Sequence, residues 1–369
     1  MEKPENQPIK ANPDNAEETG ARLNIFQKRD PFDDFMEHID QEAERRAPTE
    51  IEIEAMDRNL IQLGQIFENT NNNWHIDGAL NISILKGEYI GIHKDVDISL
   101  EAAELADTDQ HIEEMGYGFF LSYPEDDSDR SKGHVMQRIN FASGEQIEEG
   151  KHLMLAAIDE GGNILEGQSL NFVDVHVIER NAEGKPIGST GVELPEEWFV
   201  GQERDFKGQE IKISHPAKVA YYKLHSERSY DKTDLEALAK TGTLSIEDVE
   251  EIAQIFEQEF SNRQNQFEAV IKDLLQKTKP GMSVEEVFNV LTQHPVIAEK
   301  IKYIESSIRA FAQAIADSEE MSPANIMEQA LAIFKVQESF DSKRAEIDAI
   351  RKMIIDQVKL EKLRGNIEQ

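Results

Sequence analysis

The chain has 369 residues, no cysteine and a formal net charge of −34. The lack of cysteine excludes a disulfide framework, thiol catalysis and a cysteine-ligated zinc site. The chain is long enough for two domains, its start lacks the apolar core of a signal peptide, and no apolar run approaches the roughly 20 residues that a membrane-spanning helix needs. We therefore expect a cytoplasmic protein with no membrane partner.

The negative charge is concentrated in residues 51–262. Proteins that bind nucleic acid draw much of their affinity from Lys and Arg contacts to phosphates. So acidic a segment argues against a tRNA or DNA partner, and it favours a cationic or neutral small molecule, or a protein. An equally weighted alternative is that the acidity only maintains solubility.

The N-terminal part is polar and rich in Asn and Pro up to residue 29, which predicts disorder. Residues 30–45 have apolar side chains on one face and predict a short helix. Residues 51–69 predict a longer helix that precedes the most informative stretch of the chain.

That stretch is residues 74–100. It begins like a strand, turns at Asp77 and Gly78, and continues as an apolar segment before residues 94–99 alternate polar and apolar side chains. A glycine in such a turn lets the backbone approach a phosphate closely.

The alternating part contains a pair of aspartates, Asp95 and Asp97. Residues i and i+2 of a strand share a face, so the two carboxylates are expected side by side, with Val96 turned into the core. Paired carboxylates repel one another unless a cation lies between them, and hard divalent cations such as Mg²⁺ prefer oxygen ligands and bridge them to phosphates. A solvated strand edge is the alternative interpretation.

The next part of the chain predicts one helix followed by several strands. The helix covers residues 101–116. Trp198 and Phe199 are expected in an outer loop, where they line a pocket or, more commonly, cover an edge of the sheet. The strands are predicted at residues 117–123, 134–141, 152–158, 171–179 and 209–213.

From residue 215 onward the sequence predicts helices only. One series of apolar residues recurs at alternating spacings of four and three, which is typical of a seam that packs against another helix. Such seams form either the core of a helical bundle or an interface between copies of the chain, and the sequence does not separate the two. The seam residues are Ile297, Ile301, Ile304, Ile308, Phe311 and Ile315.

The stretch before Asp97 resembles the opening of the nucleotidyltransferase superfamily, which has the DNA polymerase β-like fold, and in particular its aminoglycoside and lincosamide nucleotidyltransferase branch. There a Gly-containing loop, a short helix, a turn and a strand with the pattern His-Lys/Arg-Asp-hydrophobic-Asp-hydrophobic follow in this order. The chain departs at Ala79, where the branch usually has a second Gly or a small polar residue. The matching residues are Asp77, Gly78, Ala79, Gly87, His93, Lys94, Asp95, Asp97 and Ile98.

The resemblance continues to about residue 260. Asp174 matches the aspartate of a Val-Asp-hydrophobic-His strand, which supplies the third carboxylate and acts as general base on the acceptor hydroxyl in related members; His176 is expected to support the site rather than react. Lys223 matches a helical lysine that reaches the nucleotide phosphates. The following Arg-x-Lys-Asp-x-x-Asp-Leu pattern is present with Tyr230 in place of its lysine.

The resemblance implies an α+β fold, with a polymerase β-like mixed sheet and flanking helices, followed by an all-α C-terminal helical domain. We expect an acidic, largely disordered segment at residues 1–50, the nucleotidyltransferase domain at 51–214, its helical extension at 215–262 and the helical domain at 263–369.

The implied reaction transfers a nucleoside monophosphate from a nucleoside triphosphate, with ATP among the donors, to a hydroxyl of a small-molecule acceptor. Two alternatives stay open: a toxin-like transferase acting on tRNA or protein, and a non-catalytic binding or scaffold protein on a degenerate transferase fold, which the departures at Ala79 and Tyr230 keep open. For the first reaction, Asp95 and Asp97 are the expected Mg²⁺ ligands, Asp174 the base, and Gly78, Ala79 and Lys223 the groups that position the triphosphate.

Overall fold

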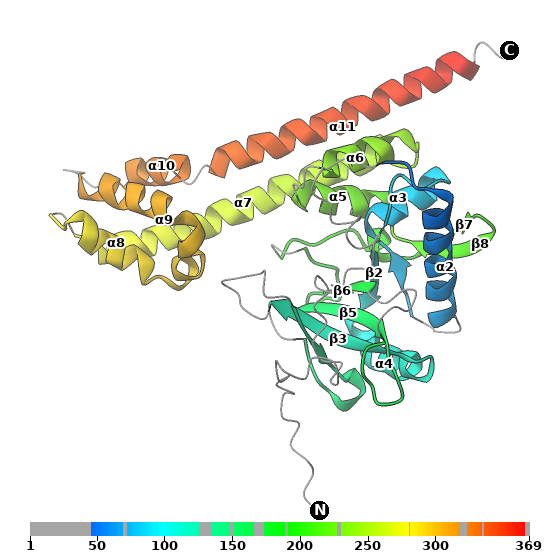
Figure 1. Cartoon of the computed structure of the whole chain (residues 1–369). Coiled ribbons are helices and arrows are strands. Elements are labelled where there is room, and N and C mark those ends of the chain that lie inside the picture. Colours follow the sequence, from blue (N-terminus) through cyan, green and yellow to red (C-terminus); the bar gives the residue numbers. More distant parts are fainter. Residues whose placement is uncertain are drawn as a thin grey trace, which may run out of the picture. The chain divides into compact units, whose positions relative to one another are not determined.

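The computed structural model describes residues 46–365 except 69–71, 94, 125–133, 148–150, 166–172, 189–190, 227–229, 280, 318–322 and 334–335 (Figure 1). The expectations for residues 1–45 lie outside the described residues. The contacts divide the chain into two compact units. The second consists mainly of Ile246–Lys352, and most of the remaining chain forms the first.

The first unit is built on one eight-stranded mixed sheet with the strand order β4-β3-β5-β6-β2-β1-β8-β7. The pairs β2–β6 and β1–β8 are parallel, and the other neighbouring pairs are antiparallel. The predicted α+β class with a mixed sheet is therefore confirmed. The strands are β1 (His75–Ile76), β2 (Val96–Glu101), β3 (Tyr117–Pro124), β4 (His134–Arg138), β5 (His152–Ala157), β6 (Val173–Ile178), β7 (Gln202–Phe206) and β8 (Gln209–Ile213).

Helices pack on this sheet through apolar side chains. The first, α2, begins at a capping box in which Thr49 and Glu52 satisfy each other's backbone N–H groups. Its buried residues, among them Met56, Leu60 and Leu63, recur at helical spacing and join one core with the inner faces of β1, β2, β5 and β6. The helices of this unit are α2 (Glu50–Ile66), α3 (Gly78–Lys86), α4 (Leu105–Glu114), α5 (Pro216–Ser226) and α6 (Asp231–Lys240).

Two details of the first unit differ from the sequence-based expectation. The strand β7 was not predicted, because its residues are largely charged; it is an edge strand that pairs only with β8. Trp198 and Phe199 do not lie in an exposed loop: they belong to a short 3₁₀ helix and are fully buried.

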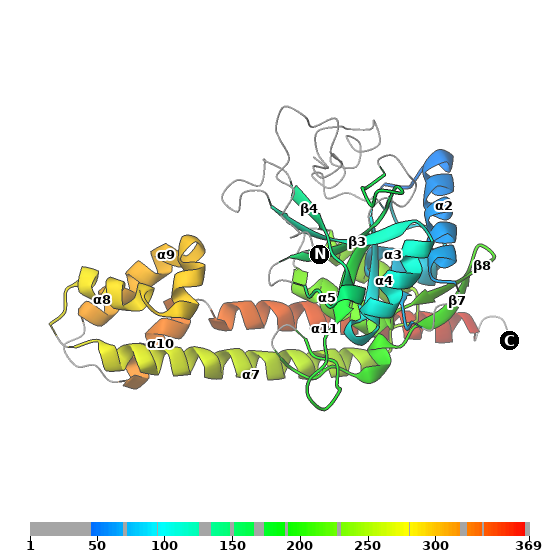
Figure 2. The same cartoon turned by 90° about the horizontal axis from the view of Figure 1, so that it is seen from below.

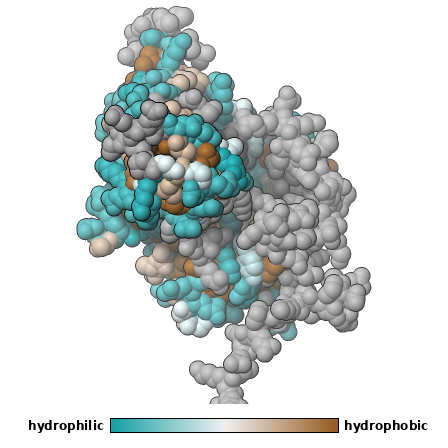
Figure 3. All heavy atoms as spheres, turned by 90° about the vertical axis from the view of Figure 1, so that its left-hand side faces the viewer, coloured by the Kyte–Doolittle hydropathy of each residue, from teal (hydrophilic) through white to brown (hydrophobic). Residues whose placement is uncertain are grey.

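The second unit is helical. Its core joins residues from α7 to α10, including Ile271, Leu291 and Phe311, and Figure 2 shows α7 beside the first part of α11. The face seen in Figure 3, on the side of α8 and α9, is mostly hydrophilic where it is described, as expected if the apolar side chains of these helices turn inward. The helices are α7 (Ile246–Lys277), α8 (Val284–Thr292), α9 (Pro295–Ala316), α10 (Pro323–Ile333) and α11 (Val336–Gly365).

The predicted apolar seam lies on α9. Its second half, Ile308, Phe311 and Ile315, is buried within the unit. The side chains of the first half are outside the described residues, and a homo-oligomer interface stays a prediction. No described helix is long and apolar enough to cross a bilayer.

The predicted domain boundary between residues 262 and 263 falls inside α7, which is one continuous helix. The contacts place the division at the start of α7 instead, between Ser245 and Ile246, and they assign the end of α11 to the first unit. A separately folding helical domain stays a prediction, and its natural start is residue 246.

Candidate active site

The parallel pairing of β2 with β6 brings two of the predicted aspartates together. Asp97 and Asp174 are direct partners in the register of these two neighbouring strands, so their side chains lie side by side on one face of the sheet. Ser99 and His176 are partners two residues further on and lie on the same face. One ligand atom each of Asp97, Asp174 and His176 lies within 4.8 Å of the others.

The other half of the predicted pair, Asp95, precedes the strand. The strand β2 begins at Val96, and Asp95 is exposed at its entrance. Its charge still acts on the cluster, because it is one of the groups that raise the pKa of Asp97. The structure thus puts the cross-strand pair of Asp97 and Asp174 at the centre and Asp95 beside it.

The turn at Gly78 packs directly against Asp97. Gly78 has a φ of +64°, and a Cβ atom there would lie 2.1 Å from the Oδ2 atom of Asp97. Only glycine tolerates both the left-handed backbone and this approach. The backbone N–H of Asp77 also donates to the carbonyl oxygen of Asp97 at 2.9 Å, so the start of α3 is fixed to the middle of the acidic cluster.

The electrostatics of the cluster fit a divalent cation. Burial, together with the neighbouring Asp95, Asp174 and Asp77, raises the pKa of Asp97 from 3.8 to about 6, although His176 opposes the shift. Carboxylates that face one another in this way are stabilised by a hard cation, for which carboxylate oxygen is the preferred ligand. Asp97 and Asp174 therefore form a suitable donor set, whereas the imidazole of His176 is a softer ligand.

Behind this cluster lies a buried lysine that the sequence did not single out. The ammonium of Lys218, in the first turn of α5, donates to both carboxylate oxygens of Asp77 at 2.9 Å. It also contacts the Oγ atom of Ser99 at 2.5 Å and the Nε2 atom of His75 at 3.1 Å. All four side chains are buried, and the Phe199 ring lies under the ammonium.

Asp77 connects this lysine to the acidic cluster. It accepts a hydrogen bond from Ser99 and lies 3.6 Å from the Nδ1 atom of His176. Although burial disfavours its charged form, Lys218 holds the pKa of Asp77 well below its usual range. Burial and the nearby Lys218 lower the pKa of His75 to about 3, so His75 is neutral and its Nε2 accepts from the lysine.

His176 is drawn towards its charged form by the carboxylates around it. Partial desolvation of the ring by its neighbours opposes this, but the contact with Asp77 and the charges of Asp97 and Asp174 outweigh it and raise the pKa of His176. Its side chain is 53% exposed, so solvent screens the effect. The expectation that His176 supports the site fits this position between Asp77 and the carboxylate pair.

Lys223, the predicted phosphate ligand, is held elsewhere. Its ammonium donates to Asp231 at 2.9 Å and to Asp234 at 2.7 Å, and all three side chains are buried. These contacts connect α5 with α6 across the segment that contains Tyr230, whose ring lies 5.3 Å from the ammonium. A role in nucleotide binding stays a prediction for Lys223.

One local signal could have revealed Lys218. Helices favour anions, not cations, in their first turn because the macrodipole is positive there. A lysine at this position between Ala217 and Val219, both buried, therefore implies a carboxylate partner supplied by another element. The sequence cannot name the partner, because Asp77 lies 141 residues away.

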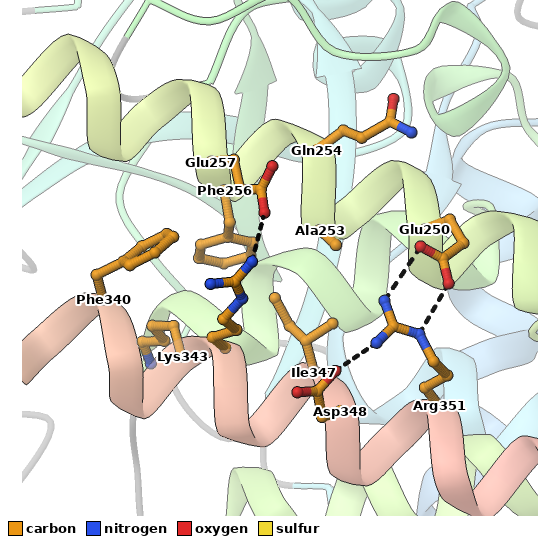
Figure 4. Close-up of a pocket in the computed structure, with 11 residues that line it drawn as sticks. Glu250, Ala253, Gln254, Phe256, Glu257, Phe340, Lys343, Ile347, Asp348 and Arg351 are labelled. Atoms are coloured by element: carbon orange, nitrogen blue, oxygen red, sulfur yellow. Dashed lines mark hydrogen bonds and ion pairs between the residues drawn. The ribbon is translucent and has the colours of Figure 1, made fainter.

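The helical unit contains a pocket of about 400 Å³ between α7 and α11 (Figure 4). Its two arginines are already ion-paired within the pocket wall: Arg351 with Glu250 at 2.8 Å and also with Asp348, and Arg344 with Glu257 at 3.2 Å. Its third cation, Lys343, lies 3.7 Å from Glu346, so each described cation of the pocket faces a carboxylate. The candidate active site is therefore the acidic face of the sheet, which carries Asp97 and Asp174.

Comparison with known proteins found one family model that matches part of the chain. Residues 59–141 match the family model described as aminoglycoside-2''-adenylyltransferase, a segment that contains Gly78 and Asp97 and ends before Asp174. This match supports a nucleotidyltransferase of the branch that the sequence resembles. No curated protein matches the chain.

Solved structures similar to this chain include the lincomycin-bound lincosamide antibiotic adenylyltransferase LnuA. It is 17% identical and is matched over 52% of this chain and 98% of its own, with a TM-score of 0.32. The antibiotic-resistance factor ANT(2'')-Ia is 11% identical over 57% of this chain and 95% of its own, with a TM-score of 0.37. An antigenic nucleotidyltransferase-like protein from Paracoccidioides brasiliensis is 12% identical over 50% and 76%, with a TM-score of 0.28. These likenesses are too low to carry an argument about the site, which rests on this chain's own residues.

Proposed function

We propose that this transferase moves a nucleoside monophosphate from a nucleoside triphosphate to a hydroxyl of a small, cationic, polyhydroxylated molecule such as an aminoglycoside antibiotic, and releases pyrophosphate. The observation that carries the proposal is the in-register pair of Asp97 and Asp174, with the Gly78 turn packed against Asp97. The name of the matched family supports the acceptor class, as does the acidity of residues 51–262, which would attract a cation.

In the proposed reaction the acceptor oxygen attacks the α-phosphorus in line with the leaving group. The bond from the α-phosphorus to the oxygen bridging it to the β-phosphorus breaks, and the electron pair leaves with pyrophosphate. Asp174, half-buried beside Asp97, takes the proton of the acceptor hydroxyl. Positioning and charge neutralisation supply most of the rate in such transfers.

The donor would lie at the start of α3. The backbone N–H groups of Gly78 and Ala79 are at the first turn of that helix, where N–H groups have no partner within the helix and the dipole favours anions. A Mg²⁺ ion held by Asp97, with Asp95 at the entrance of the strand and Asp174 opposite, would neutralise the charge of the triphosphate. A contact from Lys223 to the phosphates requires that its ammonium exchange Asp231 or Asp234 for the ligand.

The test is transfer of label from each of the four nucleoside triphosphates, labelled at the α-phosphate, to pools of aminoglycosides, other hydroxylated small molecules, proteins and RNA in the presence of Mg²⁺. We expect label in the aminoglycoside pool only, and none with the Asp97→Asn variant. Label in RNA or protein would replace the acceptor class. No transfer to any pool, by a protein that still binds Mg²⁺ and nucleotide, would favour a binding protein on a transferase fold.

A further inference from the structure

The aspartate that precedes α3 does not cap the helix. Asp77 occupies the N-cap position with an extended backbone, and Asp at this position normally accepts hydrogen bonds from the N–H groups two and three residues later. Here those residues are Ala79 and Leu80, and the Asp77 side chain makes no capping hydrogen bond.

The reason is that the carboxylate is bound from the other side. Both of its oxygens accept from Lys218 at 2.9 Å, and Ser99 donates to one of them. Lys218 and Asp77 are 2% and 5% exposed, so water does not compete for either group. Such a buried pair holds its geometry strongly, because separating the charges leaves each of them unpaired in a poorly solvated place.

We propose that Lys218 is a positioning residue of the donor site: by holding the Asp77 carboxylate away from the first turn of α3, it keeps the N–H groups of that turn open to the phosphates of the donor. This inference rests on the proposed function for the identity of the ligand. It explains why a lysine lies buried in the first turn of α5, where the helix dipole disfavours it.

The alternative position of the carboxylate is close at hand. Without Lys218, the buried carboxylate of Asp77 loses its main partner and keeps Ser99 and, at 3.6 Å, His176. The N–H groups of Ala79 and Leu80, the usual partners of an Asp at this position, then compete for it. Capping them needs no change in the extended backbone that Asp77 already has. A carboxylate there occupies the N–H group of Ala79, which the donor phosphates would also use, and it repels them. Donor binding then weakens while the carboxylate pair on β2 and β6 is unchanged.

The experiment compares Lys218→Met with the double variant Lys218→Met/Asp77→Ala, which lacks the competing carboxylate. ATP is the probe, with GTP, CTP and UTP in parallel. We expect Lys218→Met to raise the KM and the Kd for the donor by about tenfold or more, with a smaller fall in kcat, and the double variant to recover most of the affinity. Lys207→Met, which removes an ammonium bound to both oxygens of Asp57, is the matched control and leaves donor affinity unchanged.

Hydrogen exchange supplies a readout that needs no ligand. The amides of Ala79 and Leu80 should exchange more slowly in Lys218→Met than in the double variant, because only the single variant has a carboxylate to cap them. If the wild type neither transfers nor binds a nucleotide, the proposed function fails. The exchange of the Ala79 and Leu80 amides in the two variants then still tests whether Lys218 keeps Asp77 from capping α3. Equal exchange in the two variants, or a double variant that binds the donor as weakly as the single one, overturns the proposal.

The single variant could lose its fold, and a milder change covers that case. Ser99→Ala removes one hydrogen bond to Asp77 and one that Lys218 donates to Ser99, and it leaves the ion pair of Lys218 with Asp77 in place. We expect the donor Kd to rise by about twofold to fivefold, and the addition of Asp77→Ala to reverse the rise. An unchanged Kd for Ser99→Ala together with an unchanged thermal midpoint would contradict the proposal.

Discussion

The two compact units differ in what they bury. On the acidic face of the sheet, charged and polar side chains are packed against one another, and Lys218, Asp77, His75 and Ser99 are all buried. The main buried cluster of the helical unit, by contrast, consists of aliphatic residues and phenylalanine, and the charged Glu259 and Lys343 are buried outside it.

This difference indicates that residues of the first unit's buried polar cluster are kept for activity, whereas residues of the helical core are kept for stability. Burying charged groups costs free energy that apolar residues of the same volume would not, so a buried charged cluster is retained for what it does. An apolar core stabilises and performs no chemistry. We therefore expect substitutions on the acidic face to change activity more than stability, and substitutions in the helical core to do the reverse.

The largest expected effect is on transfer in Asp97→Asn. This change removes the carboxylate that contacts Gly78 and faces Asp174, and transfer should fall to background while the fold is kept. A fixed-time assay of label transfer, with circular dichroism as the control for folding, measures both. Wild-type rates for the combined Asp95→Asn/Asp97→Asn variant would contradict the assignment of the site.

Asp174→Asn should slow transfer by about two to four orders of magnitude, the range for loss of a general base. Binding of Mg²⁺ and the donor should be largely retained, which calorimetric titration measures. If the main effect is instead a loss of metal-dependent donor binding, Asp174 is a metal ligand and another group must take the proton.

The helical unit should respond in the opposite way. Phe311 is 1% exposed in the core of this unit, so Phe311→Asp should destabilise the unit by at least about 4 kcal/mol, because it removes a large apolar side chain and buries a charge. The neighbouring Ala310→Asp is the matched control, since Ala310 is exposed on the same helix.

Hydrogen exchange resolved by segment distinguishes the two units in that experiment. We expect protection to be lost across residues 284–316 and kept in β2 and β6. Equal loss in both units would show that the helices and the sheet unfold together, and that a separate helical domain is wrong.

The smallest expected effect is a gain in stability. The pKa of Asp97 is raised from 3.8 to about 6 in the folded protein, so folding favours its protonated form. The associated stability is fully present below about pH 4 and is lost as the pH rises through 6, up to about 3 kcal/mol. Asp97→Asn should therefore raise the thermal midpoint of the apo protein at pH 7 and leave it unchanged near pH 4. If the difference in thermal midpoint between the wild type and Asp97→Asn is the same at pH 4 and pH 7, the raised pKa of Asp97 is contradicted.

How far the sequence predicts this molecule depends on the range of the interaction. Local patterns were sufficient for the strand at residues 209–213 and for the apolar face of α9, whose described residues are buried as expected. The alternating pattern singled out Asp97, and the family resemblance singled out Asp174; the structure makes the two direct partners in the sheet, and their roles stay predictions. The pattern did not show that the strand starts only at Val96, which puts Asp95 outside the ladder.

The sequence could not predict contacts between different elements of the fold. The edge strand β7 has a charged sequence and is a strand only because β8 pairs with it. The burial of Lys218 depends on Asp77, 141 residues earlier in the chain. The position of Lys223 depends on nearer partners, Asp231 and Asp234, but these belong to another helix. In each case the partner, and not the residue itself, decides the outcome.

The parallel pairing of β2 with β6 has a consequence for how this chain tolerates insertions and deletions. Because side chains alternate along a strand, a shift of β6 by one residue would put Val173 or Val175 opposite Asp97 in place of Asp174. The register is fixed from the other face of the sheet, because these two valines are buried in the core and a shift would turn them out of it. A single-residue deletion within β6 would thus separate Asp97 from Asp174 even though both residues are still present. The buried valines of β6 therefore determine the geometry of the proposed site.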